Sequence, residues 1–149
     1  MKVSIGDSSS ALYTVPLQDY SPAAFEYTDA PSGQLLAAAL DENFALLNSG
    51  NPAKKGRPVQ IYMNGLGPVD NAQVSGEVAP AQPLARTRVL PTVTVAGQPA
   101  DVVFSGLAPF NVGLYQLNIT VPADAPSGIQ PVVVTANGIA SKTTNLPIQ

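Results

Sequence analysis

The fold of this chain is decided by the stretch Gly113-Leu114-Tyr115-Gln116-Leu117-Asn118-Ile119-Thr120-Val121-Pro122. Apolar residues occupy every second position and polar residues the positions between, namely Tyr115, Leu117, Ile119 and Val121 against Gln116, Asn118 and Thr120. This period of two is typical of a strand with one buried face. Pro122 ends the strand because proline cannot donate a hydrogen bond to a neighbouring strand. We therefore expect a sheet organised around residues 113–122.

The composition favours an all-β domain. The chain has 149 residues, with 15 Pro and 12 Gly, while only 11% of its residues are charged. Frequent turn residues between short apolar runs are typical of a β-sandwich or barrel, and the length suits one domain. A hydrophobic content of 45% argues against disorder.

Several function classes are disfavoured by the residues that the chain lacks. It has no His, Cys or Trp, and its net charge is −3. The commonest general base, thiol chemistry, the commonest metal ligands and the best sugar-stacking ring are therefore missing. We expect no enzymatic activity, no cofactor, no nucleic-acid partner and no membrane insertion. Met1–Asp7 lacks the apolar region of a signal peptide, so an export signal would lie outside this sequence.

The two ends of the chain resemble each other. Val3–Gln18 aligns without gaps with Val134–Gln149, and Val, Ser, Pro and Gln coincide at Val3/Val134, Ser10/Ser141, Pro16/Pro147 and Gln18/Gln149. Gly6-Asp7 falls opposite Asn137-Gly138, so both segments read as hairpins with two-residue turns. Residues 1–18 are then the closing hairpin of a preceding module, or a copy of that hairpin. The competing interpretation is a chance similarity between two polar hairpins.

Residues 34–47 are ambiguous by pattern. Their Leu- and Ala-rich composition favours a helix, with Ser32 as its N-cap. The competing interpretation is a β-hairpin, Gln34–Leu40 and Phe44–Leu47, turning at Asp41-Glu42-Asn43. Further along, Val59, Ile61 and Met63 alternate with polar residues as in a strand, and Val74–Val78 reads as a weak strand.

Candidate ligand-binding residues are few. Tyr20, Tyr62 and Phe110 are the aromatic residues that an exposed sugar platform would use. Tyr20 together with Phe25 and Tyr27 would otherwise plug one end of the sandwich. The single basic cluster is Lys54-Lys55-Gly56-Arg57. It would contact an acidic polymer, or it would be a solvent-exposed segment that leads into a strand.

Three stretches together resemble a known family of immunoglobulin-like domains. Arg57–Gly67 is similar to the opening strand of IPT/TIG domains, which occur in plexins, certain transcription factors and many bacterial surface proteins. Val93–Ala100 looks like their V-x-V-G-G-x-x-A hairpin, and Val121-Pro122 with Val132–Thr135 resembles their closing strands. This resemblance covers about residues 57–149.

A closer resemblance is to a C-terminal repeat of large secreted bacterial proteins of unknown function. It covers about residues 19–149 and is carried by four segments: Ser21–Phe25, Gly33–Leu40, Asn51–Gly56 and Gly113–Pro122. The resemblance implies an Ig-like fold and a β-hairpin at residues 34–47, although the turn Asp41–Phe44 departs from the Asn-Asp-Gly type expected there. It supplies no catalytic residues.

These observations combine into one set of expectations. The fold is an all-β, Ig-like (IPT/TIG, E-set type) antiparallel β-sandwich, with residues 19–149 as the module, 57–149 as its core and 1–18 as an additional hairpin. The function is that of a non-catalytic module of an extracellular or cell-surface bacterial protein, acting as spacer, adhesion or protein-interaction unit. The alternative is a carbohydrate-binding accessory module. Expected partners are proteins or polysaccharides at the cell surface, neighbouring Ig-like modules, or a second copy joined by strand exchange.

Overall fold

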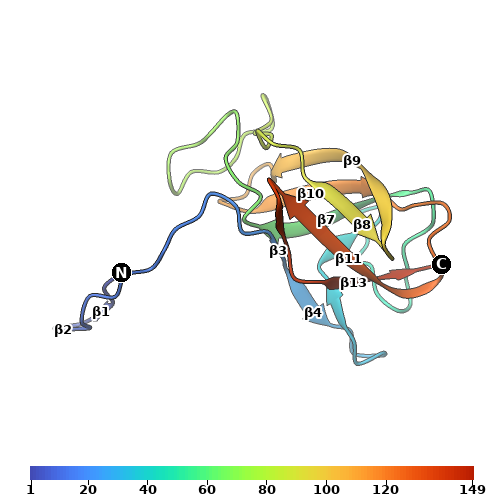
Figure 1. Cartoon of the computed structure of the whole chain (residues 1–149), viewed down its shortest axis with the longest axis horizontal. Coiled ribbons are helices and arrows are strands. Elements are labelled where there is room, and N and C mark those ends of the chain that lie inside the picture. The colour runs from blue at the N-terminus through green and yellow to red at the C-terminus, as the bar shows by residue number, and fades with distance from the viewer.

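The computed structural model describes residues 1–149 and contains strands but no helix, so no helix could span a membrane (Figure 1). The expected all-β class is confirmed. The strands are β1 (Ser4–Ile5), β2 (Ser8–Ser9), β3 (Ala23–Ala24), β4 (Glu26–Thr28), β5 (Leu35–Ala37), β6 (Ala39–Leu40), β7 (Pro58–Asn64), β8 (Thr92–Val95), β9 (Gln98–Leu107), β10 (Tyr115–Thr120), β11 (Gly128–Ala136), β12 (Ile139–Ala140) and β13 (Thr144–Ile148).

The long strand β9 joins the two halves of a curled antiparallel arrangement. Its second part pairs with β10, which pairs with β7, and the far edge of β7 carries β3 and β6. Its first part pairs with β8, which pairs with β11, and the far edge of β11 carries β12 and β13. Because β9 belongs to both halves, the sheet folds over on itself and the halves face each other like a sandwich.

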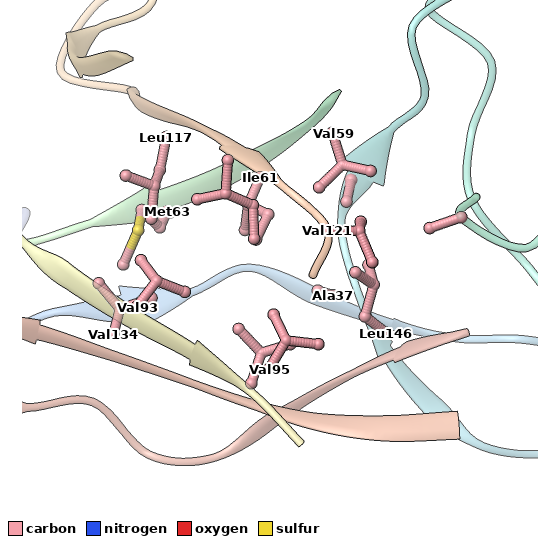
Figure 2. Close-up of a cluster of buried hydrophobic side chains, with 14 of the residues drawn as sticks. Ala37, Val59, Ile61, Met63, Val93, Val95, Leu117, Val121, Val134 and Leu146 are labelled. Carbon is pink, nitrogen blue, oxygen red and sulfur yellow. The ribbon is translucent and has the colours of Figure 1, made fainter. Parts of the chain in front are cut away.

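The core lies between these halves. Figure 2 shows Val59, Ile61 and Met63 of β7 with Leu117 of β10 on one side of the cluster, facing Val93, Val95, Val134 and Leu146 on the other. All of these side chains are at most 2% exposed. The predicted alternation therefore holds on β10, where Leu117 and Ile119 are fully buried while Gln116 and Asn118 are partly exposed. Burial of the apolar face stabilises the sheet pairing.

Residues 34–47 form strands and a turn, as the hairpin interpretation predicts. Leu40 bridges to Leu46, and the Leu47 N–H donates to the Ala39 carbonyl at 2.9 Å. Ala39 also lies opposite Ile61 of β7. Tertiary pairing overrides helix propensity here, because β5 pairs with β4 and β6 pairs with β7. Leu36, Ala37, Ala39 and Leu47 are completely buried in this arrangement.

Val74–Val78 is not a strand, so that prediction is wrong. Gly76 has a φ of +91°, and the Glu77 N–H donates to the Val74 carbonyl at 3.0 Å. This left-handed glycine turns the chain back, which a continuous extended strand does not allow. The whole excursion between β7 and β8 is instead a long connection over one end of the sandwich.

Residues 1–18 form a small hairpin of their own. Ser4 pairs with Ser9 and Ile5 with Ser8, around the predicted turn at Gly6-Asp7. Every residue from 1 to 19 is exposed, and no hydrogen bond joins residues 1–18 to the rest of the chain. Figure 1 shows this segment extending away from the sandwich.

Candidate functional site

The three candidate aromatic residues lie on three different elements. Tyr20 precedes β3 and is half-buried against the core, and Tyr62 is on β7 opposite Gln116 of β10. Phe110 is 75% exposed in the turn between β9 and β10, with a φ of +63°. None of the three lines any of the cavities in the structure. The structure therefore does not gather them into one platform.

Tyr20 fastens the incoming chain to one end of the sandwich, which we call the leading end. The Ser21 N–H donates to the Gly65 carbonyl at 2.9 Å, directly after β7 ends at Asn64. A Cβ added to Gly65 would fall 1.9 Å from the Ser21 carbonyl oxygen. Gly65 and Gly67 have φ values of +70° and +94°, so both the conformation and the close approach require glycine.

The chain leaves at the other end of the sandwich, which we call the trailing end. The Gln149 N–H donates to the Ala53 carbonyl at 2.9 Å, and the Ala53 N–H donates to the Pro147 carbonyl at 2.8 Å. The loop containing Ala53 is held at the start of β7, because the Gly56 N–H donates to the Val121 carbonyl. The leading and trailing ends thus lie at opposite ends of β7, as Figure 1 also shows.

A groove of about 420 Å³ with a mixed lining, in which 6 of 13 residues are hydrophobic, opens at the leading end. It lies beneath the excursion between β7 and β8, and six of its lining residues are Val69, Val74, Arg88, Leu107, Val112 and Tyr115. The Arg88 Nε donates to the Val69 carbonyl at 3.1 Å, and the Tyr115 hydroxyl donates to the Gly67 carbonyl at 2.6 Å. Burial raises the pKa of the Tyr115 hydroxyl.

The groove is bordered by exposed apolar residues. Val74 is 71% exposed and Val112 is 55% exposed. The excursion is fixed against the turn that holds Phe110, because the Phe110 N–H donates to the Ala79 carbonyl at 2.8 Å. Sequence reasoning missed this site because its walls come from segments that have no common pattern.

A second, shallow hollow of about 300 Å³ lies on the outer surface of β9 and β10. The Arg86 guanidinium sits 5.1 Å from the centre of the Phe104 ring, and the Gln116 amide donates to the Asn118 side-chain oxygen at 2.9 Å. Because Tyr62 lies opposite Gln116, an aromatic ring and two amides occupy neighbouring positions on this surface.

At the trailing end, the turn between β6 and residues 45–47 carries an exposed ring. Phe44 is 71% exposed and has a φ of +62°, which is rare for a bulky residue. The turn is fixed by the Asp41 carboxylate, which accepts hydrogen bonds from Asn43, Ala45 and Asn51. The Asn51 amide is the main cause of a lowered pKa of Asp41.

The basic cluster lies beside this turn. Arg57 Nε is 3.5 Å from Glu42 Oε1, which is the single ion pair of the chain. Lys54 and Lys55 form no ion pair within the chain, although the charge of Lys54 contributes to the lowered pKa of Asp41.

The two hairpins that are similar in sequence also share a side-chain arrangement. Ser10 Oγ accepts a hydrogen bond from the Val3 N–H at 3.1 Å, and Ser141 Oγ accepts one from the Val134 N–H at 3.1 Å. In both hairpins the same hydroxyl donates to the carbonyl of the next residue, at 2.9 and 2.7 Å. The coincidence of Ser10 with Ser141 in the alignment thus corresponds to one structural role.

Comparison with known proteins does not extend this description, because no protein-family model, no curated protein and no solved structure matches the chain.

Proposed function

We propose that this chain is a non-catalytic Ig-like module of the IPT/TIG type, used in a tandem array of a secreted or cell-surface bacterial protein. It acts there as a spacer, with adhesion or protein interaction through its surface. One observation carries the proposal, namely that residues 1–18 repeat the closing hairpin of residues 134–149 in both sequence and hydrogen bonding.

The exposed apolar residues of the first hairpin support its assignment to a preceding module. Tyr13, Val15 and Leu17 align with Thr144, Leu146 and Ile148 of β13, which are all buried. In the N-terminal copy the same positions are 71%, 44% and 93% exposed. A strand with this pattern needs a sheet to cover it, and the final sheet of a preceding module would supply one.

The exposed segment of residues 13–17 could be covered by a preceding module or by a second copy of this chain. The sizes of the aligned residues favour the preceding module. Ile5 aligns with Ala136 and Tyr13 with Thr144, and both C-terminal residues are at most 3% exposed. Exchange of these strands between two identical copies would force larger side chains into a packed core. The preceding module would have more room at both positions.

The junction between modules would be very short. Gln18 aligns with Gln149, whose N–H still donates to the Ala53 carbonyl of this module, while Tyr20 is already packed on the next one. Asp19 alone is then left as linker. Since the chain enters at the leading end and leaves at the trailing end, successive modules would add length in one direction.

Small-angle X-ray scattering of lengthened chains tests the spacer function. Residues 19–149 would be repeated once and twice after Gln149, which recreates the Gln18–Asp19 junction. The maximum dimension should increase by the same amount with each added copy. A maximum dimension that stays nearly constant, because the copies pack side by side, would overturn the proposal.

A second candidate function is carbohydrate binding on the surface formed by Tyr62, Gln116 and Asn118. It is favoured by the adjacency of a ring and two amides, the groups that recognise sugars. Retention on insoluble polysaccharides that is lost in Tyr62→Ala and Gln116→Ala, but kept in Phe110→Ala, would support it. Absence of retention on every polymer in a broad panel would eliminate it.

A further inference from the structure

The two ends of the module carry matching surface features. At the trailing end, the exposed ring of Phe44 projects from a turn that three hydrogen bonds to Asp41 hold in place. At the leading end lies the groove, whose apolar wall is formed by Val69, Val74, Leu107 and Val112, and which Glu77 and Arg88 also line. The trailing end thus offers a protruding ring, while the leading end offers a hollow beside the turn that carries the exposed Phe110.

The backbone of Phe44 argues that its exposure has a purpose. A positive φ costs about 1 kcal/mol or more for a residue with a side chain. Gly or Asn would adopt the conformation at lower cost, and neither would expose an apolar ring to water. The chain accepts both costs at Phe44 and again at Phe110, which is 75% exposed with a φ of +63° in the turn between β9 and β10. Such costs are expected where a partner covers the ring.

The short junction between successive modules determines which surface lies close enough to cover Phe44. Residue 19 alone separates the last residue of one module from Tyr20 of the next, and one residue spans about 3.6 Å at most. The trailing end of each module is therefore held against the leading end of its successor. No other surface of an array is brought so close by the covalent chain.

Both ends carry charges of both signs. Lys54 and Lys55 lie at the trailing end together with Asp41 and the Arg57–Glu42 ion pair. Glu77 and Arg88 both line the groove at the leading end. The charges at the junction can therefore pair with one another when two modules meet end to end.

From these observations we infer that Phe44 of one module packs into the leading-end groove of the next, so that the contact fixes the angle between successive modules. The inference rests on the proposed tandem array and deepens it, because it names the partner of each end as the facing end of the neighbouring module. An array built in this way is a stiff rod rather than a chain of freely jointed units.

The test uses the full chain with residues 19–149 repeated once after Gln149. Residual dipolar couplings measured by NMR report whether the two modules tumble as one body, in which case they share one alignment tensor. The decisive substitution is Phe44→Asn, because Asn accepts a positive φ and leaves the turn intact. Made in the first copy, it removes the ring from the junction.

The same substitution in the second copy is the matched control, because the trailing end of that copy faces solvent. We expect a shared alignment tensor in the unsubstituted chain and in the second-copy variant, and its loss in the first-copy variant. Val74→Asp places a charge at the edge of the groove, and only the groove of the second copy faces the junction. Made in the second copy, it should abolish the shared alignment tensor. Made in the first copy, it should leave the shared tensor unchanged.

Two results would overturn the inference. One is independent tumbling of the modules in the unsubstituted chain, and the other is an equal effect of Phe44→Asn in either copy. If scattering still shows a constant increase of length per copy, the spacer function stands and the array is flexible. If the length does not increase, the spacer function itself fails.

Discussion

The ring of Tyr20 lies so close to Gly67 that a Cβ added to this glycine would fall 2.2 Å from Cε1 of the ring. Gly67 also has a φ of +94°, which residues with a side chain rarely adopt. The contact joins two segments that are far apart in sequence, and it fastens the incoming chain to the leading end.

Gly67→Ala should destabilise the module through both effects. Displacing the ring and straining the backbone together should cost about 3 kcal/mol of unfolding free energy. In a Tyr20→Ala background only the backbone term remains, so the added cost should fall to about 1 kcal/mol. Urea denaturation of the four chains of this double-mutant cycle measures the difference. Equal costs in both backgrounds would show that the ring does not press on Gly67.

Deleting residues 1–18 should leave the stability of the module unchanged within about 0.5 kcal/mol. The reason is that these residues are exposed and make no hydrogen bond to the remainder. Thermal and urea unfolding of the shortened chain provide the measurement. A loss of stability well above that range would mean that the hairpin packs on this module.

Grafting tests whether the two hairpins are equivalent. Replacing Val134–Gln149 by Val3–Gln18 should destabilise the module, since Ile5 and Tyr13 would enter the tightly packed positions of Ala136 and Thr144. Adding Ile5→Ala and Tyr13→Thr to the grafted segment should restore most of the unfolding free energy. A graft that fails to fold with both corrections would contradict the equivalence of the hairpins.

Leu36→Ala should cost about 2 to 5 kcal/mol of unfolding free energy, because it opens a cavity under a side chain that is 0% exposed. Leu35→Ala is the matched control, since the neighbouring side chain is 47% exposed and points to the other face. It should cost well under half as much. A loss in Leu36→Ala as small as that in Leu35→Ala would show that β5 does not contribute to the core.

The stability of the module should decrease in acid because of Asp29. The Ser32 hydroxyl and then Ser49 donate hydrogen bonds to its carboxylate and hold the pKa of Asp29 below its usual value. A pKa lower in the folded than in the unfolded state gives stability above the unfolded value, and this stability is lost as the pH falls through the folded value.

Urea midpoints measured between pH 7 and pH 2 check the effect of Asp29. Asp29→Asn should be less stable than the unsubstituted chain at pH 7, and the difference should shrink below about pH 4. A constant difference across the whole range would exclude this carboxylate as a source of the pH dependence.

Much of the local structure follows from sequence patterns. Alternation identified the buried faces of β7 and β10, and Gly6-Asp7 and Asn137-Gly138 marked both hairpin turns. These features are local, because side chains alternate along any strand and two-residue turns need particular φ values. The resemblance between the two ends was equally readable, since it is a comparison of the chain with itself.

The sequence by itself thus determined an all-β chain, its principal strands and a repeated closing hairpin. Only the tertiary structure decided that residues 34–47 are strands despite their helix propensity, because pairing of β5 with β4 and of β6 with β7 accompanies the burial of four of their side chains. It also placed Tyr20 on Gly67, Gln149 beside Ala53, and Phe44 at the end opposite the groove. Such contacts join residues that are distant in the chain. They depend on which strands pair along their edges, and the local alternation of apolar and polar residues does not specify this pairing.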